Sequence, residues 1–328
     1  MPTYTGISNE AFRHPLDYQA EQALRSVPGF DVVARKFMEV IYERPQNIYL
    51  LGNCIEVGPR QYASLHQIFR ECLRDLDVYP QPLLFVAQSP QINAFALGQE
   101  RPSITLNTGL IDCLNEDEIR AVIAHELGHV KCGHTTLTQM AIWAIATVAG
   151  LAEATLGLSM LVSTGLILGF YEWLRKAELS ADRAAMLVTD DLNLVMKMMM
   201  QMAGGSRRYA HEMSLDEFLR QSDRYQDLDI DSLNQVYKFL LYNNLSQGVF
   251  LTHPFAVERV HYLKDWADSA DYQQIRRGNY RRSGEGSVNV SAEPSSQTPA
   301  DAQEVDRLRQ QIDDLQQEIN RIRRSRDG

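Results

Sequence analysis

The chain has 328 residues, of which 45% are hydrophobic, enough to bury the core of one large domain or two ordinary ones. Its formal net charge of -10 argues against nucleic acid as a partner, because phosphate binding needs a clustered basic surface. The first residues are polar and charged where a cleaved signal peptide would be apolar, so we expect a cytoplasmic location.

The first half of the chain alternates helical and strand-like patterns. Residues 1–50 have apolar positions at helical spacing, and we expect them to form an N-terminal helical cover for a main domain at residues 51–268. Within that domain an amphipathic helix, "YASLHQIFRECLRDL", precedes two short runs of strand-like composition, residues 82–88 and 103–110. The sequence therefore predicts a mainly helical α+β fold in which a small sheet lies beside helices.

The segment "LNEDEIRAVIAHELGHV" is predicted to form a helix with its start at Asn115, a plausible N-cap that has Glu118 three residues later. His125 and His129 then project from one helical face about one turn apart, so that both can reach a single metal ion. Glu126 stands beside the first of them, where it could take a proton from a metal-bound water. A polar helix without a metal is the alternative, but the apolar stripe around the motif favours a buried metal site.

A catalytic zinc ion needs a third protein ligand and an open position for water. His134 follows His129 by five residues, roughly 140° around a helix, so we expect it to point away from the metal. The segment "AELSAD" offers Glu178 and, one turn later, Asp182 on the same face. Glu178 would complete the ligand set and Asp182 could accept a hydrogen bond from a ligand imidazole, although an ordinary solvated helix face is the alternative for both.

Residues 140–171 are almost continuously apolar, with Glu153 as their only acidic or basic residue. Both flanks must reach the same metal ion, so this segment can cross a membrane twice or not at all. Its two arms of about 14 residues span about 21 Å, against about 30 Å for a hydrocarbon core. We therefore favour a helical hairpin that packs on the protein or associates peripherally with a membrane, over a thin hairpin that spans the bilayer twice.

The C-terminal part changes composition. Residues 269–300 are rich in Ser, Gly, Pro, Asn and Gln, which predicts a flexible linker. Beyond it, apolar residues at alternating spacings of three and four form a heptad seam, so residues 301–328 are predicted to be a short helix. Two readings fit this seam: a lone amphipathic helix on the surface, or a coiled coil that joins copies of the chain through residues 302–324.

Five segments occur in an order found in a known family: "INAFALG", "ITLNTGLIDCL", "AVIAHELGHVKCGHT", "AELSADRAA" and "THPFAVERV". In these segments the chain resembles the HtpX-like and CAAX-prenyl-protease-like zinc metallopeptidases of the gluzincin group, over about residues 50 to 265. The resemblance implies a protease that binds one Zn²⁺ per chain and acts on polypeptides. The first 50 residues, the linker and the heptad helix lie outside it.

The resemblance also assigns roles to individual residues. It implies that Glu178 is the glutamate ligand and that Asp182 supports the ligands from behind. His253 and Arg259 match an H-P-x-x-x-x-R segment, in which the histidine lies near the metal. It further implies that an extended peptide adds to an edge strand, with Asn93 near the same cleft. That predicted substrate strand consists of Ser103, Ile104, Thr105, Leu106 and Asn107.

We therefore predict a zinc metalloendopeptidase. Zinc polarises the scissile carbonyl and lowers the pKa of its water towards about 7, and Glu126 passes the proton to the leaving amine. His253, with the metal, helps to stabilise the oxyanion. The resemblance points to unfolded or membrane-linked polypeptides as substrates. The alternative is a non-hydrolytic, zinc-stabilised scaffold that recruits partners through the heptad helix, but a purely structural site would have no use for Glu126 as a base.

Overall fold

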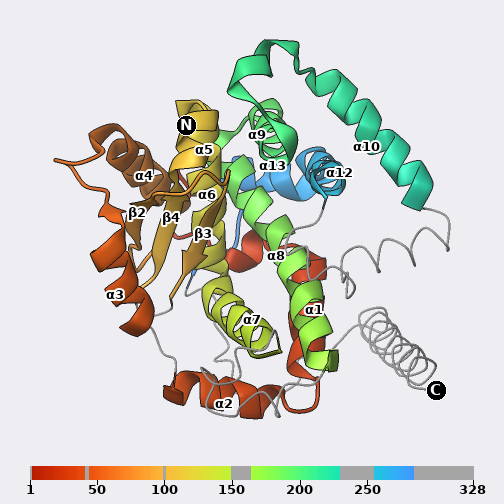
Figure 1. Cartoon of the computed structure of the whole chain (residues 1–328). Coiled ribbons are helices and arrows are strands. Elements are labelled where there is room, and N and C mark those ends of the chain that lie inside the picture. The colour runs from red at the N-terminus through yellow and green to blue at the C-terminus, as the bar shows by residue number, and fades with distance from the viewer. Residues whose placement is uncertain (1, 41–43, 99–100, 149–163, 230–254, 284–328) are drawn as a thin grey trace, which may run out of the picture.

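The computed structural model describes residues 2–40, 44–98, 101–148, 164–229 and 255–283, which form a mainly helical α+β fold with one small sheet (Figure 1). The sheet lies beside α6 (Glu116–Cys132), and α8 (Thr164–Thr189) packs against both α6 and α1 (Pro15–Arg25). The fold class predicted from the sequence is thus confirmed, with α6 and α8 as its central pair of helices.

Among the described residues the sheet has four strands, in the order β1-β2-β4-β3. These are β1 (Ile55–Glu56), β2 (Leu83–Ala87), β3 (Ala94–Leu97) and β4 (Ser103–Asn107). β2 and β4 are parallel, whereas β1 and β3 each run antiparallel to their neighbour.

The prediction that residues 103–107 form the edge strand is wrong. β4 has β2 on one side and β3 on the other, and all five of its residues are buried. The physical reason is that Ala94 to Leu97 pairs antiparallel with Leu106 to Ser103 and so covers the outer side of β4. The strand at this edge of the sheet is therefore β3.

The helix that carries the histidine motif begins and ends at clear signals. The side chain of Asn115 accepts a hydrogen bond from the backbone of Glu118, and the Glu118 carboxylate accepts one from the backbone of Asn115, so the predicted capping box is confirmed. At the other end Gly133 adopts a left-handed conformation with φ +74°, which a residue without Cβ adopts readily. The chain turns there and continues directly into α7 (His134–Val148).

The described arms of the apolar segment pack on the protein. Met140 and Ala141 of α7 and Leu166 and Phe170 of α8 are buried in one cluster with side chains of α1 and of α2 (Phe30–Val40). Residues 149–163, including Glu153, lie outside the described residues. In the described ranges, no helix is both long and apolar enough to cross a bilayer.

The N-terminal segment joins the main core as well as covering it. Tyr4, Ile7 and Phe12 are buried in the same hydrophobic cluster as the sheet and α4 (Ala63–Leu76). Asp17 on α1 is fully buried against α8, where it accepts a hydrogen bond of 2.7 Å from the Ser180 hydroxyl. This part of the chain also contains a short 3-10 helix, η1 (Asn9–Ala11), and the α-helix α3 (Arg44–Asn53).

The prediction of a flexible linker at residues 269–300 is wrong for residues 269–283. Residues 269–283 are folded, and Tyr272 and Ile275 of α13 (Ala270–Arg276) are buried. Arg282 forms a backbone bridge with Ile7, which ties this segment to the N-terminus. The rest of the linker and the heptad helix at 301–328 lie outside the described residues. Within the described ranges the remaining helices are α5 (Thr108–Cys113), α9 (Leu192–Gly204), η4 (Arg207–Glu212), α10 (Leu215–Asp229) and α12 (Ala256–Ala267).

Candidate metal centre

The side chains of His125 and His129 on α6 meet Glu178 on α8. His125 Nε2 lies 3.3 Å from Glu178 Oε2, His129 Nε2 lies 3.3 Å from Glu178 Oε1, and the two Nε2 atoms are 3.3 Å apart. A tetrahedral zinc ion with bonds of about 2.0 to 2.1 Å places its ligand atoms about 3.3 Å from one another. The three residues therefore have the donor chemistry that zinc requires, and one ligand atom from each lies within 4.8 Å of the others. The two 3.3 Å contacts of Glu178 use different oxygens, one for each imidazole.

Close approach of the two helices makes this spacing possible. A Cβ added to Gly128 would lie 2.7 Å from the Cβ of Ala184 and 3.0 Å from the Cα of Ala181. Only a glycine opposite small residues allows α6 and α8 to pack at this distance. Gly128 was not singled out from the sequence, although its place between the two histidine ligands was visible there.

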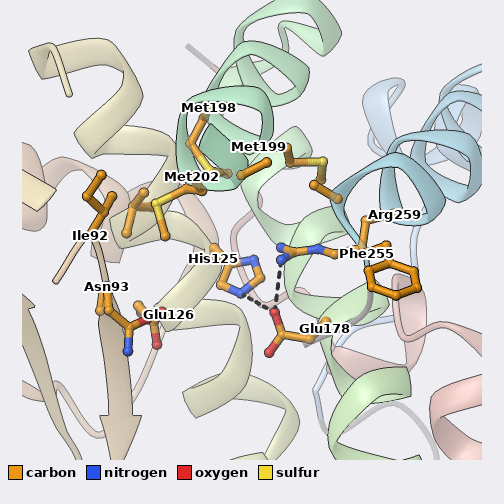
Figure 2. A pocket seen from close by; sticks show the side chains of 14 residues that line it. Ile92, Asn93, His125, Glu126, Glu178, Met198, Met199, Met202, Phe255 and Arg259 are labelled. Atoms are coloured by element: carbon orange, nitrogen blue, oxygen red, sulfur yellow. Dashed lines mark ion pairs between the residues drawn. The ribbon is translucent and has the colours of Figure 1, made fainter. Parts of the chain in front are cut away.

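Asp182 and Arg259 hold the ligands from behind. His125 Nδ1 lies 3.0 Å from Asp182 Oδ1, which leaves Nε2 facing the other ligands. Arg259, from α12, donates from Nε to Asp182 Oδ2 at 2.8 Å, and its Nη1 lies 3.3 Å from Glu178 Oε2. Figure 2 shows the ion pairs of His125 and Arg259 converging on the Glu178 carboxylate. One arginine thus fixes two buried carboxylates.

The charges of this cluster suit a cation. Burial alone would lower the pKa of His125, but hydrogen bonds to Asp182 and Glu178 raise it to about 10. Burial alone would raise the pKa of Asp182, whereas Arg259 and then His125 hold it below its usual range. A metal ion that binds there must displace any proton held on the ligand nitrogens.

A cavity of about 360 Å³ opens beside the ligands and reaches the edge strand (Figure 2). Glu126 lines it together with His125, and it lies next to Asn93 at the start of β3. Glu126 is outside the ligand set, which leaves it available as a base. The remaining lining is mostly apolar and includes Ile92, Val122, Met198, Met199, Met202 and Phe255.

The sequence analysis singled out two further histidines, His253 and His134. His253 lies outside the described residues. His134 is not among the three residues of the ligand set, and it contacts His129 through the nitrogen that faces away from that set, with 3.0 Å between the two Nδ1 atoms. The angular estimate assumed one continuous helix, whereas the chain turns at Gly133 between the two residues. The sequence carried no signal for this contact.

The fold and the site define a metallopeptidase. The profile of Peptidase family M48 matches residues 59–267, and the chain belongs to this family. It is similar to the chloroplastic plastoglobule-localized metallopeptidase 48 of Arabidopsis thaliana, with 31% identity over 284 residues, which cover 85% of this chain and 79% of that protein.

Shorter similarities lead to bacterial relatives. A Protease HtpX homolog of Caldanaerobacter subterraneus is 35% identical over 95 residues, 28% of this chain and 31% of that protein. One from Sulfurovum sp. is 30% identical over 145 residues, 44% of this chain and 49% of that protein. These matches agree with the resemblance found in the sequence motifs, and with a metal-dependent protease.

Proposed function

We propose that this protein is a zinc-dependent endopeptidase that cleaves unfolded or membrane-linked polypeptides. The observation that carries the proposal is the ligand set of His125, His129 and Glu178: the two imidazole Nε2 atoms are 3.3 Å apart, and each lies 3.3 Å from one oxygen of the Glu178 carboxylate. This donor set is one that a zinc ion binds. Glu126 lines the adjoining cavity without joining the ligand set, as a hydrolytic base must.

The protein residues supply the proton transfer and the positioning. When bound, zinc would act as a Lewis acid that polarises the scissile carbonyl and makes a water molecule acidic enough to react near neutral pH. Glu126 then accepts the proton of that water and donates it to the leaving amine. Arg259 and Asp182 keep the ligands in place during this exchange, so that no covalent intermediate with the protein is needed. We retain a role for His253 in oxyanion stabilisation as a proposal from the resemblance alone.

Substrate binding is proposed at β3 instead of β4. β3 is the edge strand, and its first residue Ala94 and the preceding Asn93 line the cavity beside Glu126. An extended peptide that pairs with β3 would pass the base, and backbone pairing accepts many sequences. The apolar lining of Met198, Met202 and neighbouring residues would favour a large apolar side chain next to the scissile bond.

We also propose a cytoplasmic location with peripheral association to a membrane through the apolar segment at residues 140–171, whose members Met140, Ala141, Leu166 and Phe170 are themselves buried in the protein. Its support is the apolar composition of that segment. Fractionation followed by an alkaline carbonate wash tests this part: peripheral association predicts release into the supernatant, whereas retention in the pellet would favour the hairpin that spans the bilayer twice.

The experiment that tests the function is digestion of a chemically unfolded protein by the full-length chain, with the products identified by mass spectrometry. We expect cleavage at internal bonds, loss of cleavage with a chelator, and recovery when zinc is returned. Products trimmed only at the ends would contradict an endopeptidase, and the absence of any cleavage by the zinc-loaded protein would contradict a protease.

A further inference from the structure

His129 is held from behind by a chain of two buried residues. His134 Nδ1 lies 3.0 Å from His129 Nδ1, and on its far side His134 Nε2 lies 3.0 Å from Asp17 Oδ2. His134 is 1% exposed and Asp17 is fully buried. We propose that His134 and Asp17 are positioning residues that fix the tautomer and orientation of the ligand His129, which makes the N-terminal helix a working part of the metal centre.

The partners of Asp17 determine the direction of every hydrogen bond in this chain. Its carboxylate accepts from Arg13 Nε at 2.8 Å, from Arg13 Nη2 at 3.0 Å and from the Ser180 hydroxyl at 2.7 Å. Beside such an acceptor, His134 must donate from Nε2, so in the neutral ring Nδ1 is the acceptor. His129 then donates from Nδ1, and its Nε2 lone pair is left for the metal.

The fold brings these residues together from four helices. Gly133 ends α6 with a left-handed turn, and His134 opens α7 directly behind His129. The ring of Trp173 on α8 contacts His134 edge to face, with 5.7 Å between centroids. Asp17 comes from the first turn of α1, which packs on α8. None of these contacts depends on an exposed or mobile group.

The two histidine ligands thus receive equivalent support by different routes. His125 contacts the carboxylate of Asp182 directly, at 3.0 Å, and that carboxylate is balanced by Arg259. His129 reaches a carboxylate through His134, and Asp17 is balanced by Arg13. Asp17 lies before residue 59, where the family match begins. A truncated chain that starts near residue 59 would keep all three ligands and lose this support.

The test measures the zinc affinity of the full-length chain by competition with a chromophoric chelator. His134→Leu and Asp17→Asn should each raise the zinc Kd about 10- to 100-fold, the range for such supporting contacts. His134→Gln should stay within a few-fold of wild type, because its amide can accept from His129 and donate to Asp17. Asp75→Asn is the matched control: Asp75 is equally buried and paired with an arginine, but its partners Arg74 and Thr3 lie outside the metal centre.

A folded His134→Leu variant with the wild-type Kd, or equal losses for His134→Leu and His134→Gln, would overturn the proposal. A second measurement covers variants that fail to fold. In the wild-type chain, long-range proton–nitrogen NMR of labelled histidine should show His134 protonated at Nε2 and His129 at Nδ1, and the opposite tautomer of His134 would refute the relay.

This inference rests on the proposed zinc chemistry, but its readouts separate the two. If the zinc-loaded wild-type chain hydrolysed no peptide but the variants showed the predicted order of zinc affinities, the endopeptidase would be contradicted and the role of His134 and Asp17 would stand. If the wild-type chain bound no zinc, the proposed function would fail, while the tautomer of His134 in the metal-free protein would still decide the relay.

Discussion

Gly128→Ala tests whether the contact between α6 and α8 sets the spacing of the metal ligands. The new methyl carbon would lie 2.7 Å from the Cβ of Ala184, whereas carbon atoms in contact are about 3.5 to 4.0 Å apart. The helices must therefore separate by about 1 Å. Overpacking of this kind costs about 1 to 3 kcal/mol, offset by about 1 kcal/mol from the higher helix propensity of alanine. The free energy of unfolding of the metal-free chain should fall by at most about 2 kcal/mol.

The effect on metal binding should be more diagnostic than the effect on stability. A shift of about 1 Å between α6 and Glu178 would widen the present 3.3 Å separations beyond what bonds of about 2.0 to 2.1 Å can bridge. We expect the zinc Kd to rise at least about tenfold, equivalent to about 1.4 kcal/mol. Gly52→Ala on α3 is the control, because its methyl group meets open space and should leave the Kd unchanged. A folded Gly128→Ala protein with wild-type zinc affinity would refute the reasoning.

Three further predictions follow from the charges and the domain limits. Arg259→Gln removes the arginine that pairs with two buried carboxylates and should lower the free energy of unfolding of the metal-free chain by about 3 to 5 kcal/mol. The loss should be smaller with zinc bound, and equal losses in denaturation experiments with and without zinc would contradict this. Burial lowers the pKa of His14 to about 3, so its contribution to stability is complete above pH 6.5 and is lost as the pH falls towards 3, by up to about 1.4 kcal/mol per pH unit. His14→Asn keeps an acceptor for the N-cap, and its unfolding free energy should vary less over this range; an unchanged slope would contradict the assignment. Deleting residues 301–328 should leave peptide hydrolysis intact. If light scattering gives the same number of chains per particle before and after the deletion, the lone helix is favoured over the coiled coil.

The histidine pair of the ligand set could be predicted because it follows from local geometry. A spacing of four residues puts His125 and His129 on one helical face, and the same spacing links Glu178 to Asp182. The capping box of Asn115 is equally local and is confirmed. Which remote acidic residue completes the site did not follow from spacing alone, and the resemblance was needed to choose Glu178.

The errors and the missed contact of His134 lie where tertiary packing decides. The pairing of β3 with the outer side of β4 depends on a four-residue strand whose sequence, "AFAL", gives no alternating pattern. The contact of His134 depends on a single left-handed residue, Gly133, that reverses the chain. The composition of residues 269–283 is typical of a linker, yet Tyr272 is buried because it packs on Trp266 and donates to Asp190.

The most direct test of the central claim is the hydrolysis rate of zinc-loaded Glu126→Gln. Glutamine preserves the shape of the side chain but cannot take the proton, so we expect zinc to remain bound and the rate to fall by about 10² to 10⁴. Glu116→Gln, the same change at an exposed position of α6, should hydrolyse peptides at the wild-type rate. A zinc-loaded Glu126→Gln protein that retains wild-type hydrolysis would contradict the assignment of Glu126 as the base and, with it, the proposed mechanism.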